Sequence, residues 1–418
     1  MSILDCVNWR QISFQELDSL LRLHGDVDKS LVDEELKNTL TPLCIACKYN
    51  REDLVTVLLH HGADIEKCCS SYRKRPLHFA CDHSNGNLGL VRKILEAKAI
   101  TDSQDADGNT GLHLACTESN VPVVELLLEN QADVSLADLD GETPLVRACF
   151  ARSHRLVEVL LHAGSDPNVK GGQPLEIVVG TRSVETLKLL IESGADVQRG
   201  AYLAQASEMD LIDMMKILNN YGADVNKTNN LGMTPLQAAC FCRFSSAESV
   251  RLLLSWGANV QAFSSTRETA LHYACAARSL DKMRLLLAYG AHPGALGAHW
   301  VTPITAALVS LFQEERESQE AGSLVVQMVR LLLAAGAKLR PDRLQGLCSI
   351  VVLIRSLGPQ ARQELLDILE WRASRPASLQ ELCRICVRRA TAPNVDSNVV
   401  RLPLPKQIVA YLQFEDIL

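Results

Sequence analysis

This chain of 418 residues lacks long apolar runs, an excess of basic charge and a basic, apolar leader. Its longest uninterrupted apolar runs, such as Ile350 to Ile354, fall far short of the ~20 residues that a membrane-spanning helix needs. Lys and Arg number 42 against 49 for Asp and Glu, a net charge of −7, which argues against a protein that binds nucleic acid by neutralising phosphates. Met1 to Cys6 do not combine a basic segment with an apolar stretch, so no signal peptide is expected.

The fourteen cysteines are too few in a chain of this length for a small disulfide scaffold. Hydrophobic residues make up 47% of the chain, which predicts a packed core rather than global disorder. We therefore expect a protein of the cytoplasm, or of cytoplasm and nucleus, with reduced thiols and with neither a membrane nor a nucleic acid as partner.

A short phrase recurs along most of the chain and a second phrase follows it each time. The first has its clearest copies at Thr41-Pro42-Leu43, Thr110-Gly111-Leu112-His113, Thr143-Pro144-Leu145, Thr234-Pro235-Leu236 and Thr269-Ala270-Leu271-His272. The second is a glycine followed by a small residue and a polar one, as at Gly62, Gly164, Gly194, Gly222, Gly257 and Gly290. Thr before Pro is typical of a helix start, and the glycine suits the left-handed position that ends a helix. The predicted repeating unit is helix, helix, hairpin.

The spacing is constant across the helices and variable across the hairpins. The interval from the first-helix leucine to the final glycine is the same in most repeats, including a disguised repeat that runs from Leu203 to Gly222. The interval from that glycine to the next leucine is shorter from Gly164 to Leu175 and from Gly194 to Leu203, which predicts two trimmed hairpins. Two other residues, Lys98 and Gln131, stand where glycine is usual.

These phrases resemble the ankyrin repeat, which has a period of about 33 residues and a T-P-L-H-x-A signature. The resemblance implies an all-α fold, a solenoid of helix pairs with short hairpins. It also implies that His78, His113 and His272, which occupy the same position in three repeats, bond to the backbone of a neighbouring loop.

The repeat count sets the predicted domain boundaries. Residues 41–340 hold about nine repeats, and one of them is lengthened by a polar, acidic segment, 313–323, expected to be a solvated loop or a helix extension. Residues 1–40, with a helix predicted over Phe14 to Leu23, form an N-terminal helical cap. Residues 341–372 form C-terminal capping helices, because the ends of a repeat array must cover an apolar face.

No residue of the array is a convincing catalytic or metal-binding group. Cysteine occupies one position in six repeats, which indicates a small buried packing residue, since a catalytic thiol would need only one copy: Cys47, Cys81, Cys116, Cys149, Cys240 and Cys275. The Cys-x-x-Cys pairs at Cys44 and Cys383 lack a second pair at zinc-finger distance. A denser group, His60, His61, Cys68 and Cys69, is largely explained by repeat position. We expect no enzyme activity, no cofactor and no metal.

The C-terminal residues, 373–418, depart from the repeat. Ser378 can cap a helix in which Leu379, Cys383 and Val387 form one apolar stripe. Further on, the chain reads Leu402-Pro403-Leu404-Pro405, which predicts an extended entry into a short apolar helix that contains Ile408.

This module resembles the SOCS box, and the whole chain resembles the ankyrin-repeat and SOCS-box (ASB) family. The resemblance implies a small helical module in which Leu379, Cys383 and Val387 bind elongin C of the elongin B/elongin C pair. It implies that Leu402, Pro403, Leu404, Pro405 and Ile408 contact cullin-5, which carries a RING protein.

The expected function is therefore that of a substrate-recognition subunit of an elongin B/C–cullin-5–RING E3 ubiquitin ligase, with an unknown protein substrate bound by the ankyrin array. The alternative is an ankyrin scaffold that tethers or sequesters a protein partner without ubiquitination. In ankyrin arrays the hairpins and first helices line the binding face. The trimmed hairpins at Lys170 to Pro174 and Arg199 to Tyr202 could shape a groove there or could be neutral shortenings, and the sequence leaves both open.

Overall fold

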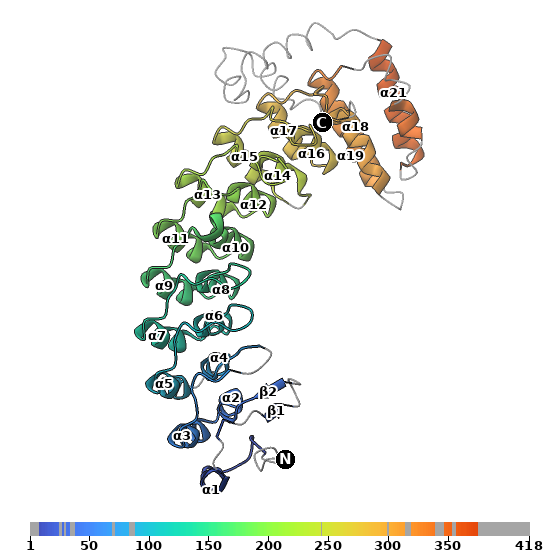
Figure 1. The fold of residues 1–418 in the computed structure, drawn as a ribbon. Coiled ribbons are helices and arrows are strands. Elements are labelled where there is room, and N and C mark those ends of the chain that lie inside the picture. The colour runs from blue at the N-terminus through green and yellow to red at the C-terminus, as the bar shows by residue number, and fades with distance from the viewer. Residues whose placement is uncertain are drawn as a thin grey trace. The chain divides into compact units, whose positions relative to one another are not determined.

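A computed structural model of the chain describes residues 8–24, 27–28, 31–33, 38–68, 72–82, 88–243, 245–298, 301–313, 319–338, 347–352 and 357–374. The chain divides into two compact units, Met1–Arg199 (unit 1) and Gly200–Leu418 (unit 2), whose elements are labelled in Figure 1. The C-terminal module predicted from the sequence lies outside the described residues.

Unit 1 is built from pairs of helices in which the second helix is longer than the first, except in the pair α10 and α11, where both have 9 residues. The first helices are α2 (Pro42–Lys48), α4 (Pro76–Cys81), α6 (Gly111–Thr117), α8 (Pro144–Phe150) and α10 (Gln173–Thr181). The second helices are α3 (Glu52–His60), α5 (Leu88–Glu96), α7 (Val121–Glu129), α9 (His154–His162) and α11 (Val184–Glu192). Each helix contacts the corresponding helix of the next repeat, so two rows form, as Figure 1 shows. The predicted helix pairs are confirmed.

Unit 2 continues the same pattern. Its first helices are α12 (Tyr202–Glu208), α14 (Pro235–Phe241), α16 (Ala270–Ala276) and α18 (Pro303–Val309). Its second helices are α13 (Ile212–Asn220), α15 (Ala247–Ser255), α17 (Leu280–Ala288) and α19 (Gln319–Ala334). Helix α12 confirms the disguised repeat around Leu203, which has no Thr-Pro start.

Each repeat is defined at both ends by local chemistry. At the start of α2 the Thr41 hydroxyl accepts a hydrogen bond from the Cys44 N–H at 3.2 Å, and Pro42 follows it. After the second helix the chain turns through a left-handed residue, such as Gly164 with φ +92°. Lys98 and Gln131 adopt the same conformation, with φ +67° and +62°, as expected for side chains that occupy the glycine position. The first-helix leucines, Leu43 and Leu145 among them, are fully buried.

The N-terminal end of unit 1 carries α1 (Phe14–His24), which contacts α3. Leu17 and Leu21 are buried, and the Asp18 carboxylate lies 2.8 Å from His61 Nε2. Two strands follow, β1 (Leu31–Asp33) and β2 (Asn38–Leu40), which pair antiparallel. These strands were not predicted from the sequence, because three-residue segments are too short to show an alternating pattern.

The lengthened repeat lies at the other end of the array. A short 3-10 turn, η4 (Ser310–Gln313), follows α18, and α19 begins at Gln319 within the polar segment. Because α19 has 16 residues against 9 in α17, part of the insertion is a helix extension. The last described helix, α21 (Pro359–Ser374), packs on α19. Gly322 permits this approach, since a Cβ there would lie 3.0 Å from the Cβ of Ala361.

One trimmed hairpin of unit 1 is visible in full. Ordinary hairpins close with a bond such as the Asp138 N–H to the Glu142 carbonyl, 3.0 Å. After Gly164 the chain instead forms a 3-10 turn, η2 (Val169–Gly171), followed by Gly172 with φ +99°. The side chain of Lys170 extends from this turn over Gly141 and donates a hydrogen bond to the backbone oxygen of Asp140. The shortened connection is therefore tied to the preceding hairpin through a side chain.

A buried lysine strengthens unit 2. Lys282 on α17 is 1% exposed, and its Nζ donates hydrogen bonds to the Ala239 oxygen at 2.9 Å, the Cys242 oxygen at 2.7 Å and the Ser245 hydroxyl at 2.6 Å. These contacts satisfy all three donors of the ammonium group. They link α17 to the end of α14.

The left-handed Gln131 predicts a stabilising substitution. Gln131→Gly should raise the free energy of unfolding by roughly 0.5–1 kcal/mol, because a non-glycine residue pays a conformational penalty in the left-handed region. Thermal and urea unfolding of the two proteins measure this. The matched reverse change, Gly164→Gln, should destabilise by about 1 kcal/mol, because a Cβ there meets no atom within 4 Å and backbone strain is the main term. Equal stability of all three proteins would contradict the argument.

Candidate partner-binding surface

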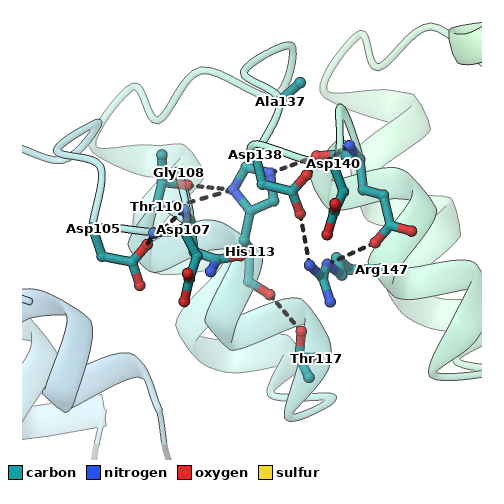
Figure 2. Close-up of polar contacts among 12 residues, drawn as sticks. Asp105, Asp107, Gly108, Thr110, His113, Thr117, Ala137, Asp138, Asp140 and Arg147 are labelled. Carbon is teal, nitrogen blue, oxygen red and sulfur yellow. Dashed lines mark hydrogen bonds and ion pairs between the residues drawn. The ribbon is translucent and has the colours of Figure 1, made fainter. Parts of the chain in front are cut away.

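Each shared histidine joins its own first helix to the hairpin of the next repeat. Thr110 donates its backbone N–H to His113 Nδ1 at 3.2 Å, so Nε2 carries the ring proton and donates to the Glu142 carbonyl at 3.0 Å (Figure 2). His78 and His272 make the same links, Nε2 to the Asn109 oxygen at 3.1 Å and to the Val301 oxygen at 3.2 Å. Burial lowers the pKa of all three rings and keeps them neutral. The expected structural role is confirmed.

Gln237 takes the place of the histidine in the α14 repeat, which sequence reasoning missed. Its Oε1 accepts the Thr234 N–H at 2.8 Å, and its Nε2 donates to the Ala262 and Glu268 carbonyls at 2.8 and 3.0 Å. An amide group thus reproduces both bonds of the imidazole ring without a titratable proton. The available signal was glutamine at the fourth position of Thr234-Pro235-Leu236-Gln237.

The recurrent cysteines are packing residues. All six thiols at the shared position are buried. Burial raises the pKa of each, to about 12 for Cys149 and Cys240. Because the thiolate is the reactive form, these thiols are unsuited to nucleophilic chemistry or metal binding.

The hairpin tips of unit 1 are held by internal carboxylates (Figure 2). Asp105 Oδ1 accepts the N–H groups of Asp107 and Asn109 at 3.0 and 2.8 Å, and Asp138 Oδ1 accepts that of Glu142 at 2.8 Å. Gly108 allows the next hairpin to approach, because a Cβ there would lie 2.8 Å from the backbone nitrogen of Leu139. These aspartates are therefore structural, although they lie on the face that would meet a partner.

Arg147, on α8, neutralises two acidic residues of the hairpin before that helix. Its Nη2 lies 2.6 Å from Asp138 Oδ2 and its Nε lies 3.1 Å from Glu142 Oε2. Burial raises the pKa of Asp138, but the bonds from Arg147 and from the Glu142 backbone outweigh this and leave it below its usual value. The side chains of unit 1 that are exposed here, and so accessible to a partner, are Asp107, Leu139, Asp140 and Phe150.

The ligase-binding residues predicted from the sequence lie outside the described residues: Leu379, Cys383, Val387, Leu402, Pro403, Leu404, Pro405 and Ile408. Of the dense His and Cys group, His61 instead pairs with Asp18. Within the described residues, no three His, Cys, Asp or Glu side chains gather as a metal site. The described helices include none that is both long and apolar enough to cross a membrane.

Comparison with protein families matches both parts of the chain. A model described as ankyrin repeats (3 copies) matches residues 12–99, 77–171 and 202–296, and a SOCS-box model matches residues 375–413. The chain belongs to the ankyrin-repeat and SOCS-box family. Its fold class, an all-helical ankyrin solenoid followed by a SOCS box, agrees with this membership, apart from the two short strands before α2.

Individual members of the ankyrin-repeat and SOCS-box family are distant relatives. Human ankyrin repeat and SOCS box protein 16 is 28% identical over 277 residues, 58% of this chain and 60% of that protein. Human ankyrin repeat and SOCS box protein 11 is 32% identical over 90 residues, 22% of this chain and 27% of that protein. The crystal structure of the human ASB11 ankyrin repeat domain matches 51% of this chain and 97% of that domain, with 28% identity and a TM-score of 0.45. The chain thus spans less than two thirds of these two full-length relatives.

The difference between His113 and Gln237 predicts a pH effect. The folded state binds a proton at His113 less readily than the unfolded state, so the free energy of unfolding should fall as the pH drops below about 6.5. His113→Gln should reduce this acid loss while keeping both hydrogen bonds. Urea unfolding between pH 8 and pH 5 measures it, and the reverse change, Gln237→His, should steepen the loss. If the free energy of unfolding depended on pH in the same way in all three proteins, the imidazole ring would not be the source of the acid loss.

Proposed function

We propose that this protein is the substrate-recognition subunit of an elongin B/C–cullin-5–RING E3 ubiquitin ligase. The observation that carries the proposal is the SOCS-box match at residues 375–413, directly after an ankyrin array. A lone repeat array would support nothing beyond protein binding. The added module indicates that whatever the array binds is brought to a ligase.

The chain contributes position rather than chemistry in this proposal. Its recurrent histidines and cysteines are occupied in holding repeats together, as His113 and Cys149 illustrate. The ubiquitin transfer takes place on the RING protein and the E2 enzyme that the cullin carries. The array raises the effective concentration of substrate lysines near that enzyme, which accelerates transfer without any new catalytic group.

The predicted site residues form two groups, each of which would bind a different partner. Leu379, Cys383 and Val387 share one stripe of the predicted helix and would enter the apolar surface of elongin C. Leu402, Pro403, Leu404, Pro405 and Ile408 would contact cullin-5. A segment as short as 373–418 has too small a core to bury its own apolar stripe, which supports a need for partners.

Co-expression of the full chain with elongin B, elongin C, cullin-5 and its RING protein tests this division. We expect a stoichiometric complex with the natural chain. Leu379→Asp should abolish it, because a carboxylate would have to be buried without a partner. Pro403→Ala combined with Pro405→Ala should retain the elongins and lose cullin-5. Gln380→Asp adds the same charge outside the stripe and serves as the matched control, which should assemble normally.

The alternative is a scaffold that tethers or sequesters its partner without ubiquitination. Purification of the natural chain alone, in the presence of both elongins, would contradict the receptor proposal and favour the scaffold. Equal binding of the Leu379→Asp and Gln380→Asp variants would show that the stripe is not the elongin-binding element.

A further inference from the structure

Two repeats place a glutamate at the same position but provide it with different neighbours. Glu142 and Glu268 each stand three residues before the first-helix leucine, and Arg147 and Tyr273 each stand two residues after it. In the α8 repeat the glutamate is neutralised, with Oε2 3.1 Å from Arg147 Nε. In the α16 repeat the arginine position is held by tyrosine.

The Glu268 carboxylate is left without a cation. Among the described residues no side chain forms an ion pair or a hydrogen bond with it. The side chain is half-buried, and burial raises its pKa. The Tyr273 hydroxyl does not compensate, because it bonds instead to the hydroxyl groups of Ser264 and Thr266, both at 3.0 Å.

The backbone of Glu268 is nevertheless fixed. Its N–H donates to the Ser264 hydroxyl at 3.2 Å, and its carbonyl accepts from Gln237 Nε2 at 3.0 Å. Gln237 lies on α14 one turn before Phe241, and Ser264 also accepts a hydrogen bond from the Tyr273 hydroxyl. The backbone that carries the carboxylate is therefore held on both sides by hydrogen bonds.

An exposed aromatic ring contacts Tyr273, the residue that stands where Arg147 stands in the α8 repeat. Phe241 is 54% exposed and meets the Tyr273 ring edge to face, with the centroids 5.8 Å apart. Leu231, 65% exposed, is at the tip of the preceding hairpin, which is joined to the next hairpin by the Ser265 hydroxyl. We call Glu268, Phe241, Tyr273 and Leu231 the Glu268 surface. It combines apolar side chains that face solvent with one uncompensated negative charge.

We propose that the Glu268 surface binds an arginine side chain, flanked by apolar residues, of a partner protein. The guanidinium group would supply the ion pair that Arg147 supplies to Glu142 and would stack on Phe241, with the apolar neighbours covering Leu231. Arginine fits better than lysine, because its planar group can bond a carboxylate and stack on a ring at the same time. A single carboxylate is a poor site for a metal ion. The inference rests on the proposed function only in making the ankyrin array the substrate-binding part.

Selection of a phage-displayed library of random 12-residue peptides on the immobilised full chain tests this. We expect the selected peptides to share an arginine next to apolar residues. Synthetic copies, measured by fluorescence anisotropy, should bind about tenfold more weakly when citrulline, which is neutral and nearly the same shape, replaces that arginine.

Three variants locate the site. Glu268→Gln should weaken binding about tenfold. Tyr273→Arg should weaken it similarly, because the new arginine would pair with Glu268 as Arg147 pairs with Glu142. Glu142→Gln, which alters a glutamate that already has its cation, is the matched control and should bind normally. Thermal unfolding verifies that each variant is folded, and the nearly isosteric Glu268→Gln decides the result if Tyr273→Arg is not.

Selection without basic residues, equal binding of the citrulline peptide, or equal binding by Glu268→Gln would each overturn the inference. Co-purification of elongin B and elongin C with the same proteins separates it from the proposed function. Retention of the elongins with no arginine preference would refute the arginine site alone. Arginine-dependent binding without elongins would refute the ligase role alone.

Discussion

At four of its repeats the array depends on the same interaction, a hydrogen bond from a side chain of the first helix to a carbonyl of the next hairpin. A helix pair of this size cannot bury its own apolar face, so it is stable only against a neighbour. The bond from His113 or Gln237 to a carbonyl of the following hairpin sets the spacing and holds the hairpin in place. Because the same side chain also completes the cap of its own helix, the bond joins helix start, hairpin and neighbour in one contact.

That arrangement explains why the polar residues of the hairpins divide into two kinds. One kind is engaged in internal contacts: Asp105 and Asp138 bond to the backbone of their turns, and Arg147 pairs with Asp138. Such residues define the shape of the surface but add little charge to it. Glu268 lies on an equally well-held hairpin, but no cation among the described residues pairs with it. The difference comes from one residue, Tyr273 in place of an arginine, and not from a change of fold. An ankyrin array can in this way vary its binding chemistry one side chain at a time.

The sequence predicted most of the array, because its signals are local. Thr-Pro starts, glycine ends and the fixed helix interval report on a few neighbouring residues, and even the atypical Lys98 and Gln131 were placed by counting. Contacts between repeats were harder to predict from the sequence. The role of Gln237 depends on carbonyls far along the chain, and β1 and β2 are too short to leave a pattern. The isolation of Glu268 became visible only when the contacts of Glu142 were known. The ligase-binding residues, Leu379 and Leu402 among them, stay predictions.

The contact of α19 with α21 also affects the tilt of the last described helix. Gly322 meets α21 near its beginning, at Ala361, and the helix continues to Ser374, immediately before the residues that match the SOCS box. At a rise of 1.5 Å per residue that arm is ~20 Å long, so a tilt of ~10° at the glycine would move its far end by ~3 Å. The absence of one methyl group at position 322 thereby influences the direction in which the last described helix runs.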